Sequence, residues 1–150
     1  MNLDDKSKER VGEEYLSKIN DLDLDKPEDR RLAVLIVNQY HMCILTFLDS
    51  QMLDADLQGQ NYNSLKNQWI KIRAKLEVTE EYEDSELMSL PFTVSRIRGK
   101  VTHNPQFSPE KEKVEGFVPD SEEFKEEIIS YAEEYSLISG ENPQRTIKDI

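Results

Sequence analysis

The chain has 150 residues, a net charge of −12 and a single cysteine. This length suits one domain, the negative charge disfavours a general nucleic-acid or anionic-membrane binder, and the lone cysteine excludes a disulfide framework. No apolar run reaches the length of a membrane span and the N-terminus has no signal-peptide core, so we expect a soluble, cytoplasmic protein. We expect one helical domain over residues 1–140 and a flexible tail over residues 141–150.

Two helices are expected in the first third of the chain. The first runs from Asp4 to about Asn20, and the second, the most apolar, runs from about Glu28 to Leu57 after a helix-start pattern around Pro27. Apolar residues of the second segment spread beyond one face, as expected of a central helix or of one that also contacts another subunit. Within it, His41 is expected to be a structural histidine with a satisfied hydrogen bond, and Cys43 a buried thiol.

The middle of the chain predicts two more helices. One follows the turn signal of Gly59–Asn63 and ends near Leu76. The next begins at about Ser85 and carries an apolar stripe of core residues, among them Val94, Ile97 and Val101. Pro91 should kink this helix or reset its start, and Gly99 should weaken its end.

The last third opens on two breaks, Asn104-Pro105 and Ser108-Pro109. After them the charged segment Glu110–Val118 is predicted to be a surface loop, and a final helix is expected to start at a cap, Asp120 or Ser121, and to end at Gly140. No segment alternates as a strand would. The sequence therefore predicts an all-α fold, an up-and-down bundle of four to five helices.

Negative charge is unevenly distributed. The windows Leu57–Leu76 and Leu87–Pro109 contain none of the 31 acidic residues and carry cations: Lys66, Lys71, Arg73 and Lys75 in the first, Arg96, Arg98 and Lys100 in the second. Two interpretations stay open. The windows form one positive surface on an otherwise negative body, or they are ordinary solvated helix faces.

The second window contains a pair of residues suited to phosphate chemistry. Arg98 and His103 have four residues between them, near the end of the fourth helix. A guanidinium binds a phosphate through two hydrogen bonds, and an imidazole exchanges a proton near neutral pH, so the pair suits metal-free phosphodiester chemistry. The competing interpretation is structural: cations favour helix C-termini, and a histidine before Asn-Pro is typical of a turn.

This arrangement resembles the HEPN superfamily (higher eukaryotes and prokaryotes nucleotide-binding). The stretch Arg98-Gly99-Lys100-Val101-Thr102-His103-Asn104 looks like its signature, and the helices over roughly Glu28–Ser139 resemble its bundle. Many members have a polar residue directly after the arginine, where this chain has Gly99.

The resemblance implies a homodimer in which two copies of the motif meet at a cleft and act on RNA or a nucleotide without metal or cofactor. A ribose 2′-hydroxyl would attack the adjacent phosphate, with His103 handling the proton and Arg98 stabilising the phosphorane. Arg96, Lys100 and Asn104 would be secondary substrate contacts. A toxin or defence role, with a cognate antitoxin or regulatory protein as partner, follows from the same resemblance.

Other chemistry has less support in the sequence. It contains no glycine-rich phosphate loop and no His or Cys pairs at metal-ligand spacing, and its paired acids are typical of solvated helix faces. The competing class is a non-catalytic acidic helical interaction protein, an adaptor or antitoxin-like partner.

Overall fold

A computed structural model describes residues 12–51, 65–75 and 86–134, and every regular element within these ranges is an α-helix. The all-α prediction is confirmed. The helices are α2 (Glu13–Asn20), α3 (Pro27–Gln51), α4 (Leu65–Lys75), α6 (Leu90–His103) and α7 (Lys111–Glu134). The predicted parts of helices at residues 4–11, 52–57, 61–64 and 135–140, and the predicted tail at 141–150, lie outside the described residues.

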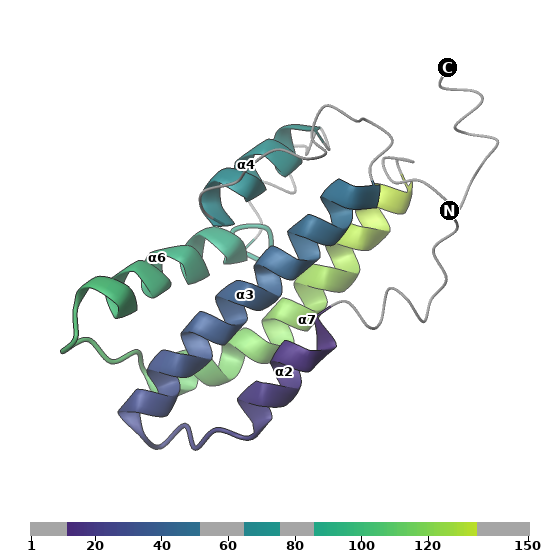
Figure 1. The fold of residues 1–150 in the computed structure, drawn as a ribbon. Coiled ribbons are helices and arrows are strands. Elements are labelled where there is room, and N and C mark those ends of the chain that lie inside the picture. The colour runs from purple at the N-terminus through teal and green to yellow at the C-terminus, as the bar shows by residue number, and fades with distance from the viewer. Residues whose placement is uncertain (1–11, 52–64, 76–85, 135–150) are drawn as a thin grey trace, which may run out of the picture.

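Helix α3 is the centre of the bundle, and α2, α4, α6 and α7 all pack against it (Figure 1). Pro27 opens it, where a missing N–H removes no helical hydrogen bond, and Glu28 and Asp29 in the first turn favour the positive end of the helix dipole. Its fully buried residues point to several neighbours: Val34, Val37, Tyr40, Ile44, Leu45 and Leu48. The prediction of a central helix is confirmed.

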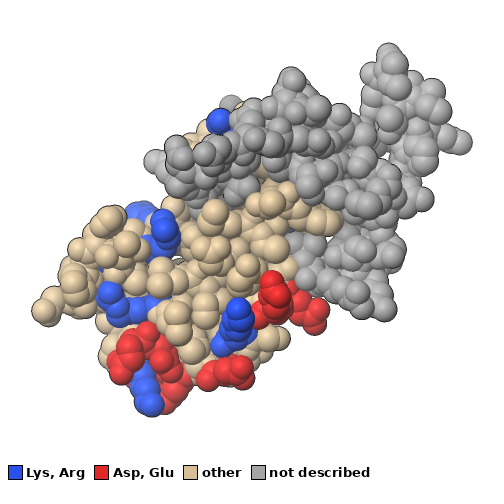
Figure 2. All heavy atoms as spheres, viewed as in Figure 1, with Lys and Arg blue, Asp and Glu red and all other residues tan. Residues whose placement is uncertain are grey.

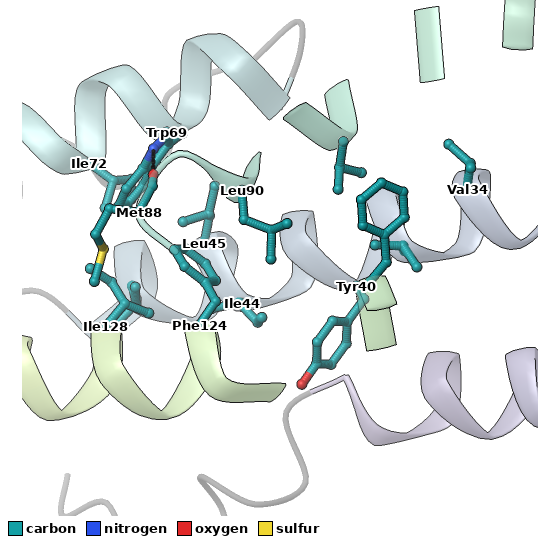
Figure 3. Close-up of a cluster of buried hydrophobic side chains, with 14 of the residues drawn as sticks. Val34, Tyr40, Ile44, Leu45, Trp69, Ile72, Met88, Leu90, Phe124 and Ile128 are labelled. Carbon is teal, nitrogen blue, oxygen red and sulfur yellow. Dashed lines mark hydrogen bonds between the residues drawn. The ribbon is translucent and has the colours of Figure 1, made fainter. Parts of the chain in front are cut away.

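An aromatic cluster joins α4 and α7 over the second half of α3 (Figure 3). The Trp69 ring meets the Phe124 ring edge-on at 5.4 Å between centroids, and its indole Nε1 donates a hydrogen bond of 3.1 Å to the Met88 carbonyl. Each fully buried side chain of this size contributes about 2–3 kcal/mol relative to exposure, so this cluster anchors the short helix α4.

Helix α6 begins later than the sequence predicted. Residues Glu86–Ser89 form a turn, and the helix starts at Leu90 with Pro91 in its first turn, so the proline resets the start as expected. The helix continues through Gly99 to His103. Its core stripe is confirmed, since Val94, Ile97 and Val101 are buried.

The predicted surface loop over 110–118 is wrong, because α7 starts at Lys111 and runs through Pro119. A proline inside a helix loses one hydrogen bond and costs about 3 kcal/mol. The buried positions Val114, Phe117, Ser121 and Phe124 are three or four residues apart, and their burial offsets that loss. Ser121, expected as a cap, lies instead in mid-helix with its side chain in the core.

Among the described residues one stretch, Pro27–Leu48 in α3, is long and apolar enough to cross a membrane, with a mean hydropathy of 1.4. Half of that stretch is buried against the other helices. Length and hydropathy of this kind are also found in the core helix of a soluble bundle, so this stretch is weak evidence for a membrane span.

Candidate functional site

Arg98 lies on the side of α6 that faces α2 across α3. Together with neighbouring residues it lines a hollow of about 490 Å³ that we name the α3 groove. Tyr15 and Lys18 of α2 form one wall, Arg98 and Thr102 of α6 form the other, and Leu35, Ile36 and Gln39 of α3 form the floor. Arg98 and Thr102 are four residues apart and therefore on one face of α6.

Two cations thus face each other over an apolar floor. The Lys18 ammonium lies 5.6 Å from the centroid of the Tyr15 ring, a cation–π contact that holds it on the groove wall. The Arg98 side chain is exposed and has no hydrogen bond or ion pair with another residue of the described ranges. Its permanent charge is therefore available to an anion in the groove.

His103 is the last residue of α6 and is exposed. It is not one of the residues that line the α3 groove. Five residues along a helix correspond to a rotation of about 140° and a rise of about 7.5 Å, so Arg98 and His103 lie on different sides of α6. Within the described part of one chain, His103 is therefore absent from the hollow that Arg98 lines.

Two of the three predicted substrate contacts have local structural roles. The Lys100 ammonium lies 5.7 Å from the centroid of the Phe107 ring. The Asn104 side-chain oxygen accepts a hydrogen bond of 3.0 Å from the Gln106 backbone N–H, which closes a turn directly after the helix. The third residue, Arg96, is exposed on α6.

Sequence reasoning missed Arg31, which holds the end of α6 in place. This α3 residue donates hydrogen bonds to the carbonyls of Val101 (2.7 Å), Asn104 (3.1 Å) and Phe107. Helix C-termini leave carbonyls unpaired and carry partial negative charge. A guanidinium there donates hydrogen bonds to these carbonyls and interacts favourably with the negative charge. The only signal in the sequence is an arginine pair opening the most apolar helix.

Arg30, the preceding residue in the sequence, forms hydrogen bonds with the segment that links α6 to α7. Its Nε donates to the Pro109 carbonyl at 2.8 Å, and its Nη2 donates to the Ser108 hydroxyl at 3.1 Å. The two arginines therefore tie the whole α6–α7 connection to the start of α3. Residues some 70 to 80 positions apart cooperate here, which no local pattern reveals.

The described parts of the two acid-free windows, helices α4 and α6, pack against each other. The Arg73 guanidinium of α4 lies 5.2 Å from the centroid of the Phe92 ring of α6. Lys71 and Arg96 are exposed on these two helices. Figure 2 shows cations on the α6 side and an uncharged surface over α3, with acidic residues gathered toward α2.

His41 has the structural role that the sequence predicted. It is fully buried, and its Nε2 lies 2.8 Å from the Ser121 hydroxyl of α7. Burial lowers the pKa of this imidazole from 6.5 to about 3, so the ring is neutral at physiological pH. Cys43 is half-buried rather than fully buried, and burial raises the pKa of its thiol.

No cluster of three or more His, Cys, Asp or Glu side chains in the described ranges is placed to hold a metal ion. Comparison with protein-family models, with curated proteins and with solved structures finds no match to this chain. The case for a function therefore depends on the groove and on the residues of α6.

Proposed function

We propose that this protein is a HEPN-like RNA-acting protein of the cytoplasm that binds RNA along α6 and cleaves it without a metal. The observation that carries the proposal is the placement of Arg98, an exposed guanidinium on the wall of the α3 groove that faces Lys18. Arg98 would bind a backbone phosphate with two hydrogen bonds. Arg96 of α6 and Lys71 of α4 are further exposed cations on helices that pack together. Because Arg96 is two residues from Arg98, about 200° around α6, these cations would contact a different part of the backbone.

In the proposed reaction the ribose 2′-oxygen attacks the adjacent phosphorus and loses its proton to a base. The bond to the 5′-oxygen then breaks, leaving a cyclic phosphate and, once that oxygen is protonated, a 5′-hydroxyl end. His103 would transfer these protons and Arg98 would stabilise the charge of the phosphorane. A histidine acting in this way must come within about 3 Å of the reacting oxygen, directly or through one water.

Arg98 and His103 lie on different sides of α6, so the described part of one chain does not bring them to the same hollow. The proposed mechanism therefore includes a homodimer. In the homodimer implied by the HEPN resemblance, two copies of the motif meet at one cleft, so that a second arginine and a second histidine reach the bound RNA. Mass measurement in solution by light scattering or sedimentation tests this directly. A monomer at assay concentrations would remove the paired-motif mechanism while leaving RNA binding open to test.

The deciding experiment incubates the pure full-length protein with labelled single-stranded RNA in EDTA. Arg98→Ala and His103→Ala should each slow cleavage by about 100-fold or more. Arg98→Ala should also weaken binding and reduce the salt slope of log K by about 0.7, the value for one phosphate contact on a single strand. The matched control is Lys113→Ala, an exposed cation on α7, which should change neither.

Two outcomes overturn parts of this function. RNA decay that is equal in the wild type and in both variants, or absent from all, removes the nuclease. Absence of RNA binding by the wild type removes the whole proposal. The competing class, an acidic helical interaction protein, would then be favoured, since Leu32 of α3 and Ile70 of α4 are large apolar side chains exposed at 45% and 40%.

A further inference from the structure

The side of α3 between α2 and α6 is an apolar face that no described helix covers. Leu32, Leu35, Ile36 and Gln39 follow one another at intervals of one, three or four residues and share that side. Leu32 is 45% exposed, and Leu35 and Ile36 are only partly buried. The same face is turned toward the viewer in Figure 1, and Figure 2 shows it as uncharged surface with cations on the α6 side and both cations and acidic residues on the α2 side.

The apolar face of α3 contains the α3 groove and extends beyond it along the helix. Leu35 and Ile36 form the floor of the α3 groove, whereas Leu32 continues the apolar surface one turn beyond the lining. From Leu32 to Gln39 the strip measures about 10 Å along the helix axis, or two turns. An occupant must therefore present apolar groups in a row about two turns long.

The walls add a charge requirement. Lys18 on α2 and Arg98 on α6 stand on opposite sides of the floor, and none of the described residues that line the groove is acidic. An occupant that fills the floor therefore passes between two cations. Its matching chemistry is apolar below and anionic on both flanks, which is the cross-section of an acidic amphipathic helix.

The bases of a nucleic-acid strand fit the floor of this groove less well, whereas a backbone phosphate can still pair with Arg98 on its wall. Base recognition on single strands depends on exposed aromatic faces on which bases stack. Among the described lining residues Tyr15 alone is aromatic, and the Lys18 ammonium lies over its ring. Leu35 and Ile36 make most of the floor aliphatic beside the Gln39 amide, which suits leucine-like side chains better than bases.

We propose that the α3 groove binds an acidic amphipathic helix of a partner protein, with its apolar side chains on Leu32, Leu35 and Ile36 and its carboxylates paired with Lys18 and Arg98. Ridges formed by residues four apart on two helices interdigitate in this way in globular proteins. The bound helix would lie between α2 and α6 and cover the exposed part of α3.

Such a partner would also regulate the proposed RNA site, because it pairs with the same guanidinium of Arg98. This consequence rests on the proposed function. The docking itself does not, since it depends only on the apolar strip and on the two flanking cations.

The test uses a designed peptide of about 20 residues with Leu at helical i, i+3, i+4 and i+7 spacing and Glu elsewhere, titrated against full-length protein by fluorescence anisotropy. A scrambled peptide of the same composition is its control. The amphipathic peptide should bind at least about tenfold more tightly than the scrambled one. Equal binding of the two peptides, or no binding of either, overturns the docking site.

Protein variants locate the site. Leu32→Glu alters a half-exposed residue and should weaken peptide binding about tenfold or more, as should Lys18→Glu combined with Arg98→Glu. The double variant should gain binding to a peptide in which Lys replaces Glu, whereas the control Lys113→Glu should behave as wild type. Unchanged binding in Leu32→Glu and in the double variant places the peptide elsewhere and overturns the proposal.

Adding the peptide to an RNA-binding assay tests the helix docking and the proposed RNA function separately. Displacement of RNA by the peptide supports the regulation as well as the docking. Peptide binding without RNA binding leaves the docking standing and removes the proposed function. Protection of Leu35 and Ile36 amides by RNA, with none by the peptide, assigns the groove to nucleic acid instead.

Discussion

The imidazole Nε2 of His41 in α3 lies 2.8 Å from the hydroxyl of Ser121 in α7, and both side chains are fully buried. The pair joins the two longest described helices inside the core. The other ring nitrogen, Nδ1, has no hydrogen-bond partner among the described residues. His41 therefore depends on Ser121 for the single hydrogen bond that offsets the burial of its ring.

Ser121→Ala should accordingly lower the free energy of unfolding by about 1–3 kcal/mol, because it leaves a buried ring nitrogen unpaired. Urea denaturation followed by circular dichroism measures the change. Ser130→Ala, an exposed serine on the same helix, is the control and should stay within about 0.5 kcal/mol of wild type. Equal losses in the two variants would mean that the His41–Ser121 hydrogen bond does not contribute to the free energy of unfolding.

Acid should destabilise the fold through His41. Its pKa is about 3 in the folded state and about 6.5 in the unfolded chain, so the unfolded chain binds more protons between these values. The contribution of neutral His41 to the free energy of unfolding is fully present above pH 6.5. Below that pH it falls, by about 1.4 kcal/mol per pH unit once His41 of the unfolded chain is protonated. Urea midpoints at about pH 7, 6 and 5 test this above the range where most carboxylates titrate.

The control for this pH dependence is substitution of each histidine in turn. His41→Gln should flatten the profile between about pH 5 and 7, whatever its effect on stability at neutral pH. His103→Gln removes an exposed imidazole and should keep the wild-type slope. A steep profile in His41→Gln would assign the acid sensitivity to other groups.

Two glycines should respond to alanine in opposite directions. Gly12 has φ +75°, and a Cβ atom there would overlap the ring of Tyr40, so Gly12→Ala should lose about 2 kcal/mol or more. Gly99 lies inside α6 with open space around its Cβ direction, so Gly99→Ala should gain about 0.5–1 kcal/mol. Thermal unfolding of both variants checks the contrast; shifts of the same sign would contradict it.

Helical periodicity was enough to find the all-α class and the central helix, but not the start of α7. The segment before Pro119 is charged, and Gly116 and Pro119 are both unfavourable to helices, so local preference indicated a loop. Burial of Val114 and Phe117 against the bundle outweighs that preference. Tertiary contacts of this kind are not encoded in a local window.

The candidate site also depends on tertiary contacts that a local sequence window does not reveal. The sequence indicated Arg98 and His103 by their spacing, but spacing alone does not bring two side chains to one side of a helix. Lys18, which faces Arg98 across the α3 groove, is 80 positions away in the chain and belongs to a helix with no apparent link to phosphate chemistry. Only the packing of α2 and α6 on α3 brings the two cations to one hollow.

Arg31→Ala should destabilise the protein by roughly 2–3 kcal/mol, because three carbonyls around the end of α6 lose a charged donor. Arg31→Lys should recover little, since one ammonium lacks the planar fork of donors that reaches several acceptors. Arg96→Ala, an exposed arginine on α6, is the control and should be near neutral.

Hydrogen exchange locates this effect. The Phe107 amide, bonded at 3.0 Å to the Asn104 carbonyl, should exchange faster in Arg31→Ala, while amides in the middle of α3 change only as global stability does. Because the Val101 and Asn104 carbonyls lie on either side of His103 in the chain, a local loss of protection there means that Arg31 fixes the position of this histidine. Uniform loss across the bundle would instead give Arg31 a general role in stability.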